Sequence, residues 1–207
     1  MKNIYSEDAF TGLEAAIVLI AFVVVAAVFS YVVLGAGFFT TQTAQATVHT
    51  GVAQASSSLE IVGNVMGIVE TATHPDQINY VNVSVALTAG GTAMDLTQMV
   101  ISYSDNNGGR NANILTNAGG ITDCNTVLET AVTAEADQRW CVSQRINTVG
   151  DANTLLEPNE IWVLSIQTPD SASVNTKITV NLQPAVGAVL PITRTLPGAF
   201  TPVQAIY

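Results

Sequence analysis

The chain opens with a short polar stretch, which is followed by an apolar run that dominates its pattern. The stretch reads MKNIYSEDA, whereas Leu13 to Phe39 contain Glu14 as their only charged residue, and no other follows until Glu60. A bilayer core of about 30 Å needs ~20 apolar residues in a helix, so this run is long enough to span a membrane. Because it is apolar on every side, it is not an ordinary amphipathic surface helix.

The helical pattern continues beyond this run. The following residues contain no proline up to Met66 and keep apolar side chains at helical spacing: Val48, Val52, Ala55, Leu59, Val62 and Met66. We therefore expect one helix from Phe10 to about Met66, roughly 80 Å long at ~1.5 Å per residue. Its glycines weaken a lone helix, but glycine and alanine permit close packing against other apolar helices.

After Pro75 the pattern changes to that of strands. Partly alternating runs rich in β-branched residues occupy 80–87, 96–103, 161–167 and 178–182. Turn residues separate them, at 105–109 and at 158–159. We expect an α+β chain, in which a long N-terminal hydrophobic helix (10–66) precedes an immunoglobulin-like antiparallel β-sandwich (67–207) of about seven strands.

The composition narrows the range of partners. The net charge is -10, from 16 acidic residues against 6 basic ones, which leaves no basic patch for phosphates and argues against a nucleic-acid partner. Charged residues make up 11% of the chain, under half of the roughly 25% usual for soluble domains, and 48% is hydrophobic. Much of the surface is therefore expected to face a membrane or to be covered by neighbouring subunits.

Two cysteines and one sequon point to an exported protein. Cys124 and Cys141 have no further ligand at metal-binding spacing, so we expect a disulfide worth ~2–4 kcal/mol within a side loop or hairpin. Two buried free thiols are the alternative. The sequence Asn82-Val83-Ser84 makes Asn82 a candidate site of N-glycosylation.

Catalytic and metal-binding chemistry has little support. His49 is expected to interrupt a packed helix face, and His74 to be solvated in a linker that contains a proline. Asp151-Ala152-Asn153 with Glu157 lacks the glycine and the regular oxygen spacing of a calcium loop, so we expect a turn there. We therefore predict no enzyme activity, cofactor or metal site. A solvated acidic face, near Arg139, is expected from Glu129, Glu135 and Asp137.

The N-terminal region carries a specific resemblance. Residues 10–22 (FTGLEAAIVLIAF), 25–28 (VAAV) and 34–39 (LGAGFF) are similar to the N-terminus of archaellins from methanogenic archaea, which are type IV pilin-like subunits of the archaeal swimming filament. The resemblance is closest over residues 10–58. Downstream, 95–96, 101–105, 156–160 and 193–197 resemble the looser pattern of the archaellin sandwich.

This resemblance implies a route of assembly. A prepilin-peptidase-like protease would remove a leader of residues 1–9 by cutting between Ala9 and Phe10. Many archaellin precursors have a basic residue and then glycine before the cut, where this chain has Asp8 and Ala9, so cleavage after Asp8 is the alternative. The mature subunit would be anchored in the cell membrane, and a membrane platform with its ATPase would then add it to an extracellular homopolymer.

The resemblance also assigns roles within the helix. Glu14 would set the register by meeting the N-terminal amine of an adjacent subunit, because a charge in an apolar core needs a partner. The alternative is an interaction with the helix dipole worth ~0.3–1 kcal/mol. Packing in the filament core is expected from Leu13, Ile17, Ile20, Val24, Ala27, Gly35 and Gly37.

Two other functions compete with that of a swimming filament. An adhesion pilus uses the same assembly chemistry, and only the resemblance favours swimming. A solitary membrane-anchored binding domain needs ~20 apolar residues and would gain nothing from the helix that continues beyond them.

Overall fold

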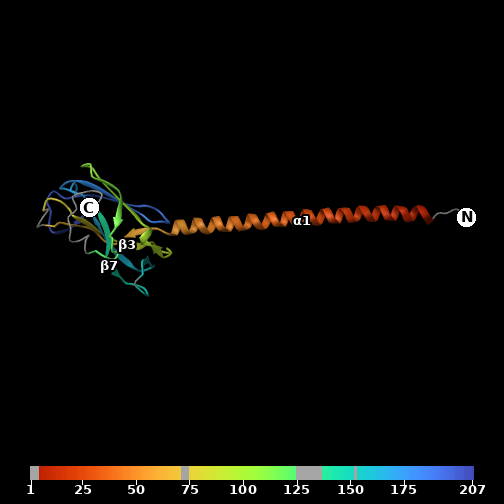
Figure 1. Ribbon diagram of the computed structural model, residues 1–207, viewed down its shortest axis with the longest axis horizontal. Coiled ribbons are helices and arrows are strands. Elements are labelled where there is room, and N and C mark those ends of the chain that lie inside the picture. Colours follow the sequence, from red (N-terminus) through yellow and green to blue (C-terminus); the bar gives the residue numbers. More distant parts are fainter. Residues whose placement is uncertain (1–4, 71–74, 125–136, 152) are drawn as a thin grey trace. The chain divides into compact units, whose positions relative to one another are not determined.

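The computed structural model describes residues 5–70, 75–124, 137–151 and 153–207, with the backbone alone at 5–11, 53, 55 and 56. The described part contains the helix α1 (Tyr5–Ser56), the short 3-10 helix η1 (Leu96–Gln98) and twelve strands (Figure 1). The strands are β1 (Leu59–Ile61), β2 (Val65–Ile68), β3 (Tyr80–Leu87), β4 (Met94–Asp95), β5 (Val100–Asp105), β6 (Arg110–Thr116), β7 (Arg139–Ile146), β8 (Leu155–Leu156), β9 (Ile161–Gln167), β10 (Lys177–Gln183), β11 (Leu190–Thr195) and β12 (Val203–Ile206).

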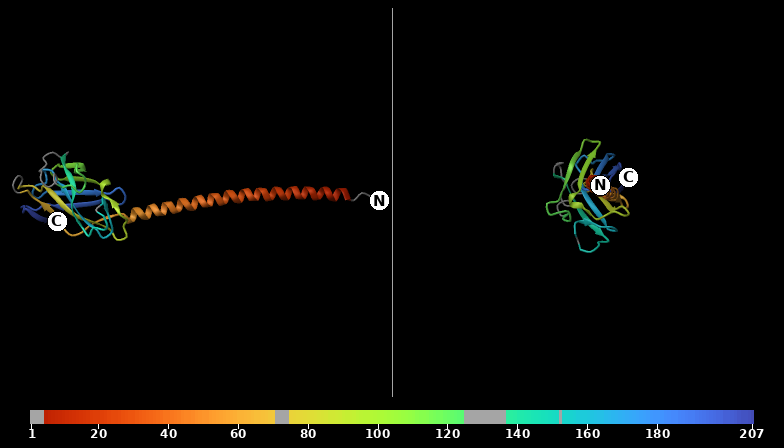
Figure 2. Two further views of the ribbon diagram at one scale, coloured as in Figure 1. Left: turned by 60° about the horizontal axis from the view of Figure 1, so that its bottom comes forward. Right: turned by 90° about the vertical axis from the view of Figure 1, so that its right-hand side faces the viewer.

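The helix α1 is a single unbroken element of 52 residues (Figure 2). It contains no proline, and its many alanines favour the helical backbone. It begins at Tyr5, before the expected start at Phe10. No helix-breaking residue separates Tyr5 from Phe10, and the acidic Glu7 and Asp8 suit the first turns of a helix.

The expected end of the helix at Met66 is wrong, because α1 ends at Ser56. Three consecutive serines at 56–58 favour the end of a helix, since their hydroxyls compete for backbone hydrogen bonds. Beyond them Leu59 and Val65 are buried in the sandwich core, on β1 and β2, which both pair with β3. The boundary expected between 10–66 and 67–207 moves accordingly, and the two compact units are Met1–Thr50 and Gly51–Tyr207.

The strands form one large, mainly antiparallel sheet that folds into a sandwich. Its ten strands follow the order β11-β10-β5-β6-β7-β9-β3-β2-β12, with β1 added on β3, while β4 and β8 form a separate pair. The two layers meet where β6 and β7 run parallel over only Leu115↔Arg139 and Thr116↔Trp140. At the other end Thr195 N donates to Tyr207 O at 2.8 Å, which brings the sandwich close to a barrel. The expected fold class is confirmed.

Three of the four expected strands coincide with observed ones. The ranges 80–87 and 161–167 are β3 and β9, and 178–182 lies within β10. The strand expected at 96–103 starts too early, because residues 96–98 form η1. Asp95 caps this turn by accepting a hydrogen bond from Thr97 N at 2.9 Å, so β5 begins only at Val100.

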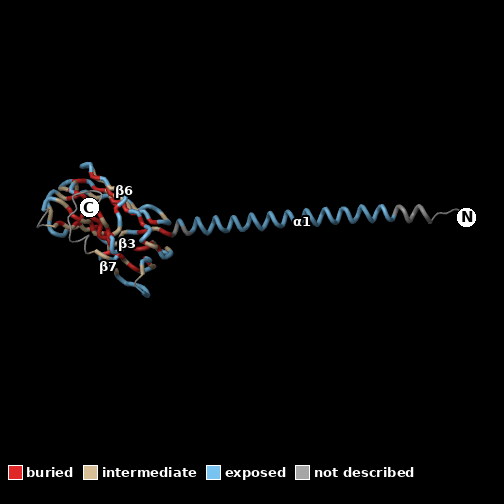
Figure 3. The backbone as a smooth tube through the Cα atoms, viewed as in Figure 1, coloured by how far each residue is buried: buried red, intermediate tan, exposed pale blue. Residues whose placement is uncertain are grey.

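The sandwich encloses a continuous apolar core, seen in Figure 3 as the buried residues within the strands. Trp140 and Trp162 are among its largest fully buried side chains. At one rim, the buried Tyr103 donates its hydroxyl to Asp105 at 3.0 Å, and Ser171 donates to the same carboxylate. Burial, and then the charge of Asp105, raise the pKa of Tyr103 well above its ordinary value. The other oxygen of Asp105 accepts from Asn107 N and Gly109 N and holds the 105–109 turn.

Candidate functional site

The surface of α1 is the most unusual feature of the described structure. All described side chains from Gly12 to Val52 are exposed, as Figure 3 shows, although the segment is long and apolar enough to cross a membrane. Phe22, Phe29 and Phe39 are exposed by 71%, 69% and 72%. Soluble proteins rarely leave so large a contiguous apolar surface in water, so α1 presents a binding surface for lipid or protein.

The residues expected to pack in a filament core form one stripe along this surface. Leu13, Ile17, Ile20, Val24 and Ala27 follow one another at intervals of four and three residues, which places them on the same side of the helix. Their side chains are all exposed. Gly35 and Gly37 have open space where a Cβ atom would be, so an adjacent helix could approach the backbone closely there.

The C-terminal part of the helix is polar in sequence but hides many of its polar groups. The hydroxyls of Thr40, Thr43, Thr47 and Thr50 each donate to the carbonyl oxygen four residues earlier, at 2.8–2.9 Å. With the donor satisfied inside its own helix, each threonine presents mainly its methyl group. This part of α1 can therefore be covered by another helix without leaving hydroxyl donors unpaired.

Glu14 is the only formally charged residue of α1 whose side chain the structure describes. It is exposed, and no described residue pairs with it. Ala9 and Phe10, the expected cleavage positions, lie on the helical backbone, but their side chains fall outside the described ones. The register role of Glu14 and the cleavage position therefore stay predictions.

The expected disulfide is confirmed. Cys124 and Cys141 are bonded, with Cα atoms 5.4 Å apart, and Cys141 is fully buried on β7. The bond attaches the chain that follows β6 to the layer that contains β7 and β9. The side loop or hairpin expected between the cysteines, with Glu129 and Glu135, lies for the most part outside the described residues.

Replacing both cysteines with serine is expected to lower the free energy of unfolding by about 3 kcal/mol. The bond closes a loop over a sequence separation of 17 residues, and such loops give this magnitude through the entropy of the unfolded chain. Denaturant unfolding of unassembled subunits measures it. The wild-type protein after reduction and alkylation is the matched comparison, and equal stability with and without the bond would contradict the prediction.

The candidate glycosylation site lies in the middle of the sheet. Asn82 is on β3 between β2 and β9, half-buried, and its Oδ1 accepts a hydrogen bond from Ser165 Oγ at 2.7 Å. The sequon gives no information about strand position, so the sequence did not anticipate this placement. A glycan at Asn82 stays a prediction.

The other candidate groups are not brought together. His49 is exposed on α1, Asp151 is exposed, and His74 and Ala152 lie outside the described residues. Asn153 uses its Oδ1 to accept from Leu155 N at 2.8 Å, as expected for a turn. Within the described ranges, no group of three or more His, Cys, Asp or Glu side chains is placed to hold a metal ion.

One buried carboxylate was missed by the sequence analysis. Glu160 is 2% exposed and accepts hydrogen bonds from Val149 N at 2.7 Å, Glu157 N at 3.1 Å and Trp162 Nε1 at 3.1 Å. It therefore holds the segment before β9 against that strand. The only signal in the sequence was an acidic residue in the turn that precedes a strand, and such residues are usually solvated.

An exposed apolar helix that precedes a β-sandwich is the architecture of type IV pilin-like filament subunits. Within that class, a family described as archaeal-type flagellin matches residues 9–194. The chain is 39% identical to "Probable flagellin 2" of Archaeoglobus fulgidus, over 94% of this chain and 92% of that protein. It is 91% identical over 32 residues to the "24 kDa flagellin" of Methanospirillum hungatei, covering 16% of this chain and all of that sequence.

A solved structure agrees with these sequence matches. The archaeal flagellum of Methanospirillum hungatei strain JF1 is similar with a TM-score of 0.63 and 29% identity, over 94% of this chain and 98% of that one. The chain therefore belongs to the archaeal-type flagellin family. It is a structural subunit of the archaellum, the swimming filament, and the expected family is confirmed in preference to the adhesion pilus.

Proposed function

We propose that α1 is the polymerisation element of this archaellin, and that it packs against the same helix of neighbouring copies in the core of the filament. The observation that carries this proposal is the complete exposure of α1 between Gly12 and Val52. Fully burying one Val, Leu, Ile or Phe side chain contributes about 1.5–3 kcal/mol relative to its exposure to water, so this surface is strongly disfavoured in water and requires cover by lipid or by other helices. The role is structural and involves no catalysed reaction.

The membrane precedes the filament as the environment of the helix. The exposed segment spans 41 residues, about twice the ~20 that a bilayer core requires. The helix beyond the part that a bilayer covers contains the threonines whose hydroxyls bond within the helix. Other helices cover this part better than lipid does. Extraction from lipid into a helical bundle replaces one apolar environment with another, so assembly need not overcome the full transfer free energy.

The route of assembly follows the family. We propose export of a precursor, removal of residues 1–9 by a prepilin-peptidase-like protease, and addition of the subunit by a membrane platform and its ATPase. The cell membrane holds the unassembled subunit, and the finished filament is extracellular. The disulfide supports an exported sandwich, because such bonds persist in oxidising compartments.

Purified filaments test this proposal directly. Electron microscopy is expected to show helical filaments of this chain, and a deletion strain without a second archaellin gene is expected to lose motility. Mass spectrometry of the same filaments is expected to give a chain that begins at Phe10. A chain one alanine heavier indicates cleavage after Asp8, whereas an intact Met1 refutes processing and monomers without filaments refute the homopolymer.

Replacing Glu14 with alanine is expected to slow filament assembly at least tenfold while leaving processing intact. If Glu14 meets the N-terminal amine of a neighbour, its loss leaves a positive charge buried without a partner, which costs at least 2 kcal/mol. The measurement is the ratio of processed membrane-bound subunit to filament over time. Glu60→Ala, which removes an exposed carboxylate from β1, is the matched control. Assembly of Glu14→Ala at the wild-type rate would favour the dipole alternative.

A further inference from the structure

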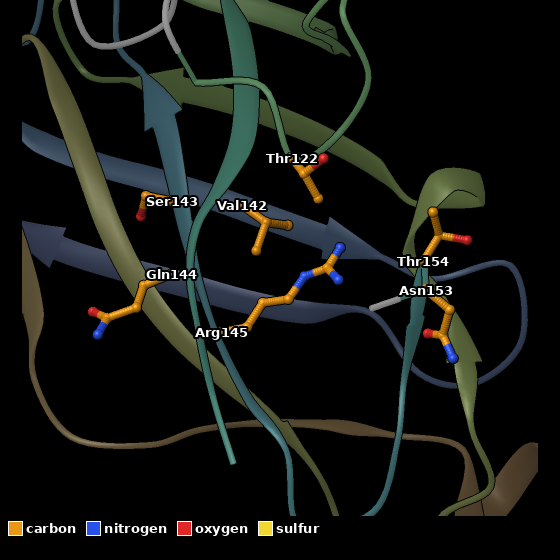
Figure 4. A pocket seen from close by; sticks show the side chains of 7 residues that line it. All are labelled: Thr122, Val142, Ser143, Gln144, Arg145, Asn153 and Thr154. Carbon is orange, nitrogen blue, oxygen red and sulfur yellow. The ribbon is translucent and has the colours of Figure 1, made fainter. Parts of the chain in front are cut away.

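A polar groove lies on the sandwich, beside the second half of β7 (Figure 4). Its volume is about 480 Å³, and six of its seven lining residues are polar. One wall is β7 and the opposite wall is the segment that leads into β8. The lining residues are Thr122, Val142, Ser143, Gln144, Arg145, Asn153 and Thr154.

Arg145 is the only charged residue in this lining. Its guanidinium lies 4.2 Å from the centroid of the Trp162 ring, and in Figure 4 the side chain extends toward the gap between Thr122 and Thr154. Stacking on a buried aromatic ring holds the planar guanidinium in one orientation. Arg145 is therefore a pre-positioned cation and not a mobile surface charge.

A β-bulge produces this placement. The register between β7 and β9 shifts between Val142 and Gln144, so Ser143 is an extra residue and Arg145 lies opposite Trp162. Bulges redirect the side chains that follow them, and they occur often beside functional sites. Without the shift, Arg145 would not share a side of the sheet with Trp162.

The donors of this guanidinium are not used within the described part of the subunit. Arg194 donates to Thr193 O at 2.9 Å and Arg139 donates to Gln138 O at 2.9 Å, whereas the contact of Arg145 is the Trp162 ring. A guanidinium presents five N–H donors in a fork that matches a carboxylate. A half-buried Arg145 with unused donors therefore favours an acceptor from outside the subunit.

We propose that this groove receives a carboxylate side chain from a second copy of the chain in the filament. With 16 acidic and 6 basic residues, packed sandwiches repel one another unless the few cations contact carboxylates across the interface. A second copy is thus a source of many carboxylates. Exposed ones on the sandwich include Asp76, Asp137, Asp151 and Asp170. This inference rests on the proposed homopolymer.

Arg145→Gln tests the groove against a matched control. It is expected to raise the rate of subunit release from purified filaments about tenfold and to flatten its dependence on salt, because a buried charge contact acts mainly on dissociation. Lys177→Gln removes one exposed positive charge from β10, outside the groove, and is expected to leave both quantities near wild type. Thermal unfolding of the unassembled subunits is expected to show that both variants fold, with Arg145→Gln lower only by the lost contact with Trp162.

Arg145→Lys identifies the partner. A carbodiimide joins a lysine amine to a carboxylate in direct contact, and filaments copolymerised from isotopically light and heavy subunits distinguish bonds between copies from bonds within one. The expected product is a mixed light and heavy peptide pair that joins residue 145 to an acidic residue of the other copy. Failure of Arg145→Lys to assemble, while Lys177→Gln assembles, also supports the proposal.

Three outcomes would overturn it. These are release from Arg145→Gln filaments at the wild-type rate, an equal effect of Lys177→Gln, and Arg145→Lys filaments that assemble but whose cross-links at residue 145 are absent or confined to one subunit. Wild-type chains that form no filaments at all contradict the proposed homopolymer itself. Normal filaments without an effect at Arg145 contradict only the role of the groove.

Discussion

Val24→Asp in α1 should weaken the equilibrium for adding a subunit to the filament by about a hundredfold to a thousandfold. Val24 is 54% exposed, near the middle of the apolar run, and lies on the stripe that is expected to face other helices. An unpaired carboxylate between packed apolar helices costs several kcal/mol relative to a free subunit in which it meets water. Since ~1.4 kcal/mol is a factor of ten, a cost of ~3–4 kcal/mol in the filament core gives this effect. The measurement is the concentration of free subunit in equilibrium with filaments.

Val203→Asp is the matched control for this substitution. Val203 is 57% exposed, which is close to the exposure of Val24, but it lies on β12 at the edge of the sheet. A charge there stays in water, and assembly is expected to remain within a few-fold of wild type. If both variants assembled equally well, the apolar surface of α1 would not be the assembly surface.

The helix was predictable because its signal is dense and unambiguous. More than twenty residues that are almost all apolar and include no proline can form little else than a helix. Its end was not predictable, because Leu59, Val62 and Met66 fit the helical spacing although this stretch folds as strands. Their environment decides the outcome, since β1 and β2 both pair with the distant strand β3. The spacing of apolar residues within one segment does not show whether that segment pairs with a strand elsewhere in the sequence.

The strands that were missed share a physical reason. β6 buries only Ile114, and β7 contains a bulge, so neither shows the alternation that marked β3. The disulfide was predictable because two cysteines permit one intramolecular pairing. The groove was not, because Arg145 and Trp162 lie on different strands and meet through a register that the bulge shifts.

Gly187→Ala should destabilise the sandwich by about 2–6 kcal/mol. Gly187 has a φ of +114° in the loop between β10 and β11, and a Cβ atom there would lie 1.5 Å from the backbone carbonyl oxygen of Ser57. The unusual backbone conformation costs ~1–3 kcal/mol for alanine, and displacing a packed backbone group costs a further ~1–3 kcal/mol. Ser57 directly follows α1, so this contact fixes the chain where it enters the sandwich. Thermal unfolding of unassembled subunits measures the loss.

Gly90→Ala separates the two contributions. Gly90 also has a positive φ, +82°, but open space surrounds the position of its Cβ atom, so alanine there meets only the backbone penalty of ~1–2 kcal/mol. The excess loss of stability in Gly187→Ala then measures the contact with Ser57 alone. Equal losses in the two variants would mean that the β10–β11 loop moves aside at little cost, and that Ser57 is held by β1 and its pairing with β3 instead.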